Sequence, residues 1–320
     1  MLVLNQREVE ELLDMPGCID AMEAALAALA RGEMAMPLRS VFIPEGAQSL
    51  IGLMPAYRGG EARMHSLKAV CVFPENPQRG LDAHQGTVTL FDGETGQVSA
   101  LMNASAVTAI RTAAVSGVAT RLLAREGVST LGILGAGVQA RSHAEAMRAV
   151  RDFERVLLYS PTAEHARACS EEIGAEVAGS PAEVVEAADV LVVATNASKP
   201  VLERAWLRPG THVNSAGGRP PSMTELDTAT IAGSAFFVDR RESTEAEAGD
   251  YKRALEEGAI EEGHIRAEIG EIAAGLEPGR ASDEEITVFR SMGLAVEDLA
   301  AADYVVRRAR EQGVGTDVEL

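Results

Sequence analysis

The chain has 320 residues, and 48 acidic against 29 basic residues give it a formal charge of −19. This charge repels phosphate backbones and anionic lipid headgroups, so neither nucleic acid nor a membrane is an expected partner. Hydrophobic residues make up 46% and aromatic residues 4% of the chain, a balance that is typical of α/β enzymes and unlike a disordered chain. The length predicts about two domains.

The cysteines Cys18, Cys71 and Cys169 are far apart and form no CxxC pair, so free thiols in a reducing compartment are expected. The first residues lack the basic region and long apolar stretch of a signal peptide, and no later apolar segment reaches about 18 residues. We therefore expect a cytoplasmic protein. The six histidines show no metal-ligand spacing, and no metal site is expected.

The first part of the chain predicts a sheet-rich α+β domain. Residues 6–31 carry apolar side chains at helical spacing, and residues 36–91 read as short strands broken by proline and glycine. Residues 91–102 read as a strand, a tight turn and a returning strand, which indicates a hairpin. A helix is expected over 104–124.

One lysine in this domain raises a question. Lys68 lies in the run SLKAVCVFP, which is apolar, rich in β-branched residues and expected to form a buried strand. A lysine buried without a partner can have its pKa lowered by roughly 3 to 5 units, so such a strand usually supplies a carboxylate or a ligand. No acid is close in sequence before Glu75. The residues near Lys68 in the sequence therefore do not identify the anion that pairs with it.

From Val128 the pattern changes to short apolar strands that alternate with helices or tight connections, which predicts a parallel, doubly wound sheet. One of these helices is expected to begin at Ser180, because a serine cap is followed by proline and then by glutamate. After Asp239 the chain is expected to be mostly helical and acidic. Residues 284–309 predict a long amphipathic helix that could pack back on the first domain.

The segment LGILGAGVQARSH carries the strongest motif, because G-x-G-x-x-A follows a strand and opens a helix. The glycines allow a tight turn and the close approach of a pyrophosphate, whose charge is met by N–H groups at the helix N-terminus. We expect a bound dinucleotide. Its predicted contacts are Gly135, Gly137, Val138, Gln139, Ala140, Ser160, Thr162, Thr195 and Asn214.

The second strand of this domain indicates which dinucleotide is bound. A site that prefers NAD normally ends this strand with Asp or Glu, which bonds the ribose 2′-OH. Here the strand ends with Ser160 and Thr162 and has no acid. Both hydroxyls could bond a 2′-phosphate and Arg167 could reach it, so NADP is predicted, with NAD as the alternative.

The sequence resembles the ornithine cyclodeaminase/mu-crystallin family. The resemblance runs from about Leu38 to Ala302 through GLMPAY, SLKAV, HQGTVTLFD, AIRTAAVSGVAT, GAGVQARSH, VNSAGG with ELD, and TVFRSMGLAVEDLAAA. It implies a Rossmann domain at 117–291 and a substrate-binding and dimerisation domain at 1–116 with 292–320. It also implies a homodimer that binds a nicotinamide cofactor and acts on α-amino or α-imino acids.

The resemblance also implies a substrate site. Arg39, Lys68 and Arg111 match family positions that hold the substrate carboxylate, with Lys68 and Arg111 as the catalytic pair, so the partner of the lysine is expected to be the ligand. An arginine fork and a lysine point charge suit a carboxylate. Three alternatives stay open: Arg39 as a surface charge, Arg111 paired with a structural acid, and Lys68 as an edge-strand side chain that reaches solvent.

The chain departs from the family at one catalytic position. Cyclodeaminases carry an aspartate after the glycines of NAVGGD, whereas NSAGGRPPSMTELD places Arg219 there. Glu225 and Asp227 match the family's ELD segment, where a capping or structural role is expected. We therefore expect an NAD(P)-dependent reductase of an imino acid such as pyrroline-2-carboxylate, or an amino-acid dehydrogenase. Ornithine cyclodeaminase and a non-catalytic binding protein are the alternatives.

Overall fold

The computed structural model describes residues 1–217 and 223–319, and these form two compact units. Unit 1 comprises Met1–Arg111 and Gly293–Leu320, and unit 2 comprises Thr112–Met292. The units cover nearly the same ranges as the domains expected from the sequence. The substrate-binding, dimerisation and cofactor-binding roles of those domains stay predictions.

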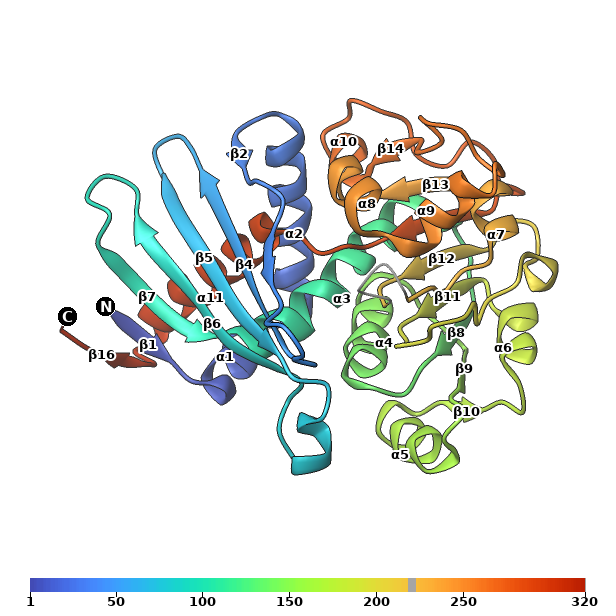
Figure 1. The fold of residues 1–320 in the computed structure, drawn as a ribbon, viewed down its shortest axis with the longest axis horizontal. Helices are drawn as coiled ribbons and strands as arrows, with labels where there is room; N and C mark the ends of the chain where they lie inside the picture. Colours follow the sequence, from blue (N-terminus) through green and yellow to red (C-terminus); the bar gives the residue numbers. More distant parts are fainter. Residues whose placement is uncertain (218–222, 320) are drawn as a thin grey trace. The chain divides into compact units, whose positions relative to one another are not determined.

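Unit 1 is built on a mixed sheet of eight strands in the order β16-β1-β7-β6-β5-β4-β2, with β3 paired to β4. Figure 1 shows the sheet with its long helices. Its strands are β1 (Leu2–Leu4), β2 (Met34–Ala35), β3 (Ser40–Phe42), β4 (Leu50–Arg58), β5 (Met64–Val72), β6 (His84–Asp92), β7 (Val98–Asn103) and β16 (Thr316–Asp317). Its helical elements are α1 (Gln6–Leu12), α2 (Met15–Ala30), η1 (Asn76–Arg79) and α11 (Ala295–Gln312), and α3 (Ala104–Leu123) runs from unit 1 into unit 2.

The helical segment expected over 6–31 is two helices, because a cap interrupts it. The side chain of Asp14 accepts a hydrogen bond from the N–H of Gly17 at 3.0 Å, and Pro16 lies in the first turn of α2. Aspartate at the cap and proline just inside it both favour a new helix start. The expected hairpin is confirmed, since β6 and β7 pair antiparallel and Asp92 closes the turn through the N–H of Thr95 at 2.8 Å.

The C-terminal helix α11 packs against α2 and against strands β4, β5 and β6, as expected from its amphipathic pattern. In β5 the side chains of Ser66, Lys68 and Val70 are buried, whereas Leu67 and Ala69 between them are partly exposed. This alternation follows from the two-residue period of a strand. It places Lys68 on the covered face of the sheet.

Unit 2 holds a second eight-stranded sheet in the order β10-β9-β8-β11-β12-β15-β13-β14, and all neighbouring strands are parallel. The prediction of an α/β chain with a doubly wound parallel sheet is confirmed. The strands are β8 (Thr130–Leu134), β9 (Arg155–Tyr159), β10 (Glu176–Val177), β11 (Val190–Val193), β12 (His212–Ser215), β13 (Ala235–Val238), β14 (Ala267–Glu268) and β15 (Thr287–Arg290). The helical elements are α4 (Val138–Val150), α5 (Ala163–Ile173), α6 (Pro181–Ala187), η2 (Arg204–Trp206), α7 (Thr228–Ala232), α8 (Arg241–Glu247), α9 (Gly249–Glu256) and α10 (Ile269–Ala273).

The expectation of a mostly helical chain after Asp239 is wrong in two places. Residues 267–268 form β14, and residues 287–290 form β15, which lies between β12 and β13 inside the sheet. A buried strand of four residues has no alternation, so periodicity does not separate it from a helix. Consequently α11 begins only at Ala295 and not near residue 284.

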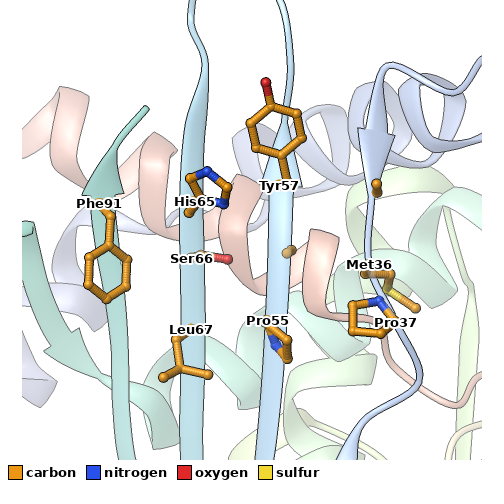
Figure 2. A pocket seen from close by; sticks show the side chains of 10 residues that line it. Met36, Pro37, Pro55, Tyr57, His65, Ser66, Leu67 and Phe91 are labelled. Carbon is orange, nitrogen blue, oxygen red and sulfur yellow. The ribbon is translucent and has the colours of Figure 1, made fainter. Parts of the chain in front are cut away.

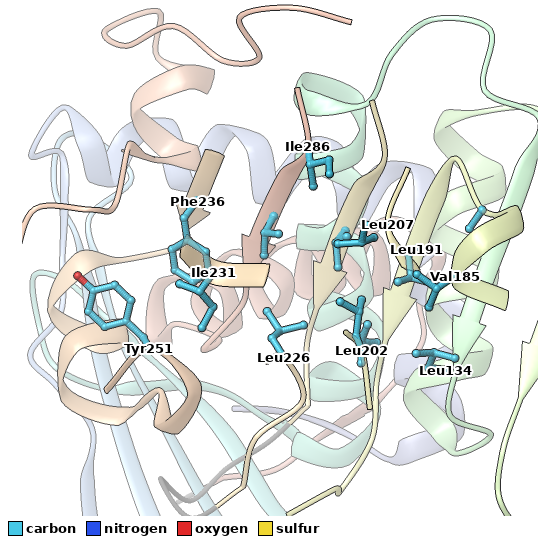
Figure 3. Packing of buried hydrophobic residues seen from close by; sticks show 14 of the residues in the cluster. Leu134, Val185, Leu191, Leu202, Leu207, Leu226, Ile231, Phe236, Tyr251 and Ile286 are labelled. Atoms are coloured by element: carbon cyan, nitrogen blue, oxygen red, sulfur yellow. The ribbon is translucent and has the colours of Figure 1, made fainter. Parts of the chain in front are cut away.

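Apolar side chains of the parallel strands pack against those of the connecting helices. Figure 3 shows part of this core, in which Leu134 and Leu191 from neighbouring strands share a cluster with Val185 of α6, and Phe236 of β13 stacks on Tyr251 with ring centroids 5.8 Å apart. This packing holds the carboxyl ends of β8, β11 and β12 at one edge. No helix among residues 1–217 and 223–319 is long and apolar enough to cross a membrane.

Candidate active site

Lys68 meets a carboxylate of its own chain. Its Nζ lies 2.9 Å from Oδ1 and 2.8 Å from Oδ2 of Asp298, and the two side chains are only 2% and 1% exposed. Asp298 lies 230 residues further along the chain, in the first turn of α11. The edge-strand alternative is wrong, because β5 pairs with β4 on one side and β6 on the other. The counter-charge of Lys68 is therefore Asp298 of the protein itself, and not the ligand that was expected.

Arg111 joins the same cluster from α3. Its Nε donates to Oδ1 of Asp298 at 2.9 Å, and its Nη1 donates to Oε2 of Glu297 at 2.7 Å. The Thr108 hydroxyl, one turn earlier on α3, lies 3.4 Å from Lys68 Nζ. All four charged side chains are at most 2% exposed. The structure thus brings Lys68 and Arg111 together, with Asp298 bridging the two cations and Glu297 binding Arg111.

Burial and charge act in opposite directions in this cluster. Burial lowers the pKa of Lys68 to about 7, although the carboxylate of Asp298 favours its charged form. Burial by itself would raise the pKa of Asp298, but Arg111 and Lys68 together hold that pKa below its usual value. The ammonium is therefore the group that titrates near neutral pH, while the carboxylate stays ionised.

Arg39 lies near this cluster, just before β3. Its Nη2 donates to the carbonyl oxygen of Gly293 at 2.8 Å, and its positive charge helps to lower the pKa of Lys68. Unlike the four buried groups, Arg39 is partly exposed. Within the cluster itself, the cations Lys68 and Arg111 pair with the anions Glu297 and Asp298. A guanidinium fork and an ammonium are the groups that commonly bind a small carboxylate in proteins.

Glu297 and Asp298 are site residues that the sequence reasoning missed. They follow one another in LAVEDLAAA, an otherwise apolar stretch of a helix whose apolar face packs on the sheet of unit 1. Two adjacent acids inside such a stretch are a signal for buried charge, since acids are almost never fully buried unless they are paired. That signal names no partner, because the partners lie far away in sequence.

The glycine-rich turn of unit 2 lies between β8 and α4. Gly135 has φ +121°, and a Cβ there would collide with the carbonyl oxygen of Ala194, so glycine is required. Gly137 is the N-cap residue of α4, and a Cβ on it would meet no atom within 4 Å. One glycine is fixed by close backbone packing, and the other keeps open space before the helix N-terminus.

These features fit a dinucleotide pyrophosphate, which needs close backbone approach and free N–H groups at a helix start. Beside the turn, Val138 is 57% exposed, Ala140 is buried, and the buried Oε1 of Gln139 accepts no hydrogen bond from the described residues. An orphaned buried oxygen needs a donor. Gly135, Gly137, Val138 and Gln139 are the residues that would hold the pyrophosphate.

The residues that follow β9 are exposed or partly exposed. Thr162 is exposed and caps α5 without a hydrogen bond from its own side chain, and Ser160 is partly exposed. Arg167 is exposed one turn into α5. Two hydroxyls and a guanidinium are thus present in the segment where an acid would select NAD.

Thr195 and Asn214 differ in how they are placed. Thr195 follows β11, and both its N–H and its hydroxyl donate to Oε1 of Glu225, at 2.6 and 2.9 Å. Asn214 lies within β12 and is fully buried, where its amide donates to Oγ1 of Thr120 at 2.9 Å. Asp227 caps α7 through the N–H of Thr230 at 2.8 Å, which confirms its capping role. Arg219 lies outside the described residues.

The parallel sheet of unit 2 with its glycine-rich turn is typical of enzymes that bind a dinucleotide, and unit 1 adds a buried cluster of two cations and two anions. The family description "Ornithine cyclodeaminase/mu-crystallin family" matches residues 1–313. The chain is 40% identical to a Δ1-pyrroline-2-carboxylate reductase of Bacillus cereus over 327 aligned residues, which cover 100% of both chains.

Two solved structures are similar over their whole length. The Δ1-pyrroline-2-carboxylate reductase of Thermococcus litoralis in complex with NADH and L-proline has a TM-score of 0.95 and 40% identity, covering 99% of this chain and 100% of that one. An archaeal alanine dehydrogenase dimer with bound NAD has a TM-score of 0.93 and 35% identity, covering 100% and 99%. The chain belongs to the ornithine cyclodeaminase/mu-crystallin family. The predictions of this family and of a nicotinamide-dependent oxidoreductase are confirmed.

Proposed function

We propose that this enzyme reduces a cyclic α-imino acid, Δ1-pyrroline-2-carboxylate, to L-proline. The observation that carries this proposal is the 40% identity to a reductase of that substrate over the whole of both chains. The cations Lys68 and Arg111 of unit 1 support it, because the substrate has a single carboxylate next to the reacting carbon. The lyase alternative is disfavoured, since Arg219 stands at the position of the cyclodeaminase aspartate.

The reduced nicotinamide, when bound, supplies the hydride that the imine carbon receives. Every other part of the reaction falls to side chains of this chain. Arg111 is held rigidly by Glu297 and Asp298, so its guanidinium is already oriented when a carboxylate arrives. Lys68, with its pKa lowered to about 7, can hold that carboxylate as an ammonium or give a proton to the imine nitrogen near neutral pH.

An assay with two substrates tests this proposal. The purified chain should oxidise NADPH or NADH when Δ1-pyrroline-2-carboxylate is added, with formation of L-proline. It should not form proline from ornithine with catalytic NAD, because that reaction starts from an ammonium group and needs a base to free the amine. Arg219 stays protonated and cannot be that base. Proline from ornithine, or no cofactor oxidation with the imine, would contradict the proposal.

The cofactor preference gives a further prediction. The end of β9 has Ser160 and Thr162 with Arg167 nearby and no acid, so NADPH should bind more tightly than NADH. Fluorescence titration of the chain with each cofactor measures this difference. Glutamate in place of Thr162 should reverse the preference, because the new carboxylate repels the 2′-phosphate. Two solved relatives are described with bound NADH and bound NAD. Equal affinity for the two cofactors, or tighter binding of NADH, would contradict the prediction.

A groove of about 490 Å³ lies on the face of the unit 1 sheet that is opposite to Lys68. Figure 2 shows Pro55 and Tyr57 of β4, Leu67 of β5 and Phe91 of β6 around it, with Met36 and Pro37 beside them. Tyr57 and the nearby Leu53 are 36% and 39% exposed. An apolar sheet face of this kind marks an interaction site. Because a relative is described as a dimer, we assign this face to a second copy of the chain.

The dimer is tested by mass. Light scattering should give twice the 33.7 kDa of one chain, and glutamate in place of Tyr57 should shift the protein toward the monomer, since it places a charge in a dry interface. Val177, which is 52% exposed on β10 of unit 2, provides the matched control as Val177→Glu. An unchanged mass for Tyr57→Glu would remove this face from the interface. The cytoplasmic location stays a prediction from cysteine usage.

A further inference from the structure

Glu225 is a buried acid that the carboxylate site of unit 1 does not use. Its side chain is fully buried in unit 2 and accepts four hydrogen bonds. Oε1 receives the N–H and the hydroxyl of Thr195, at 2.6 and 2.9 Å. Oε2 receives the hydroxyl of Ser215 at 2.9 Å and the N–H of Gly217 at 3.0 Å. One carboxylate therefore ties the segment after β11 to the segment after β12.

Arg290 of β15 holds the same segment from its carbonyl side. Its Nη1 donates to the carbonyl oxygens of Gly217 at 2.6 Å and Ser215 at 3.3 Å, and it lies 3.8 Å from Oε2 of Glu225. Its Nε lies 3.3 Å from Oδ1 of the buried Asp250 on α9. The N–H of Gly217 is thus bound by the carboxylate of Glu225, and its carbonyl oxygen is bound by the guanidinium of Arg290.

These tied segments lie against the glycine-rich turn. Strands β8, β11 and β12 are neighbours, and a Cβ on Gly135 would collide with the carbonyl oxygen of Ala194. A Cβ on Gly217 would collide with the carbonyl oxygen of Thr195 and with Glu225 itself. The backbone therefore approaches closely at Gly135 and at Gly217. In open parallel sheets, ligands bind at the carboxyl ends of such strands.

We propose that Glu225 is a positioning residue for the dinucleotide. Glu225 sets the shape of the dinucleotide site by holding the segments after β11 and β12 against the glycine-rich turn. This inference rests on the proposed use of a nicotinamide cofactor. Glu225 acts through Thr195 and Gly217, because its own oxygens are occupied by their donors. A capping role, expected from the sequence, belongs to Asp227 and not to Glu225.

The charge of Glu225 is part of this function. A protonated carboxyl would turn one acceptor into a donor and break a bond to Thr195 or Gly217. Burial raises the pKa of Glu225, against the charge of Arg290 and the donated hydrogen bonds. Among residues 1–217 and 223–319, the charged groups that face it are Arg290 from β15 and, beyond Arg290, Asp250 from α9. Cofactor affinity should therefore weaken as the pH falls through this raised pKa.

The test is cofactor binding to the full chain without imino acid, measured by fluorescence titration with NADPH and NADH. Glu225→Gln should raise the Kd for both cofactors by about tenfold or more, since backbone donors lose a charged acceptor. Its affinity should also lack the acid-side pH step of the wild-type chain. At saturating cofactor, the KM for the imine should stay within about twofold, because the carboxylate site in unit 1 is intact.

Two controls keep the result interpretable. Glu186→Gln changes an exposed acid on α6 and should leave both Kd values unchanged. If Glu225→Gln does not fold, Ser215→Ala removes one hydroxyl donor and should raise the Kd by about two- to fivefold. A folded Glu225→Gln chain with wild-type Kd values and a lowered melting temperature overturns the inference, because the role is then only structural. A wild-type chain that binds neither cofactor instead refutes the proposed function.

Discussion

Methionine in place of Lys68 is expected to lower kcat/KM for the cyclic imine in a chain that still folds. The loss corresponds to about 2 to 5 kcal/mol of transition-state binding free energy. Methionine keeps the apolar stem but removes the ammonium that we propose to bind the substrate carboxylate. The fold should survive because Asp298 retains its bond from Nε of Arg111 at 2.9 Å. Steady-state kinetics and the melting temperature of the variant measure the two effects separately.

The pH profile sharpens this test. Because the pKa of Lys68 is lowered to about 7, its ammonium is lost as the pH rises through that value, and kcat/KM of the wild-type chain should fall there. The Lys68→Met chain should lack this step. Arg7→Met, which changes an exposed cation on α1, is the matched control and should keep both the rate and the profile. A Lys68→Met chain with wild-type kcat/KM would make Lys68 a scaffold residue.

Alanine in place of Asp298 is expected to lower the free energy of unfolding by about 3 to 5 kcal/mol. The change removes the carboxylate that the buried ammonium of Lys68 touches and one of two acids that bind Arg111. A buried charge without its partner is costly, whereas an exposed pair contributes little. Glu11→Ala, which breaks the exposed pair with Arg7, should therefore cost less than about 1 kcal/mol. Urea unfolding measures both values.

A second variant separates charge from volume. Lys68→Met combined with Asp298→Leu removes both charges of the pair and should recover part of the stability lost in Asp298→Ala.

The loss of stability at acidic pH provides a further test of the role of Asp298. Since the pKa of Asp298 is lowered in the fold, its stabilisation is complete above about pH 4 and is lost as the pH falls below that. Asp298→Ala should show a weaker loss of stability in acid than the wild-type chain.

The predictions from sequence succeeded where the signal was local. The glycine turn, the cap at Ser180 and the hairpin at Asp92 each depend on residues within a few positions of one another, and all three are present. The strand β15 was missed because four buried residues carry no period, and its neighbours in the sheet lie far away in the chain. Local rules describe an element but not its partners.

The role of Glu225 shows the same limit. From the sequence alone it was one acid of an ELD segment, for which helix capping or a structural role is expected. Its partner Thr195 follows β11 and its partner Ser215 ends β12, and only the parallel sheet places these two strands side by side. The acid that caps a helix and the acid that ties two strand ends are two residues apart, and no local pattern distinguishes them.

By itself the sequence determined the parallel sheet and the glycine-rich turn, because short motifs and alternation record local geometry. The resemblance to the family added the pairing of Lys68 with Arg111 as a candidate site. The tertiary structure decided which anion Lys68 meets. Asp298 reaches it across 230 residues, since α11 packs on the same face of the sheet as the lysine. A charge buried in a strand requires a counter-charge, but only the packing of distant elements selects which residue provides it.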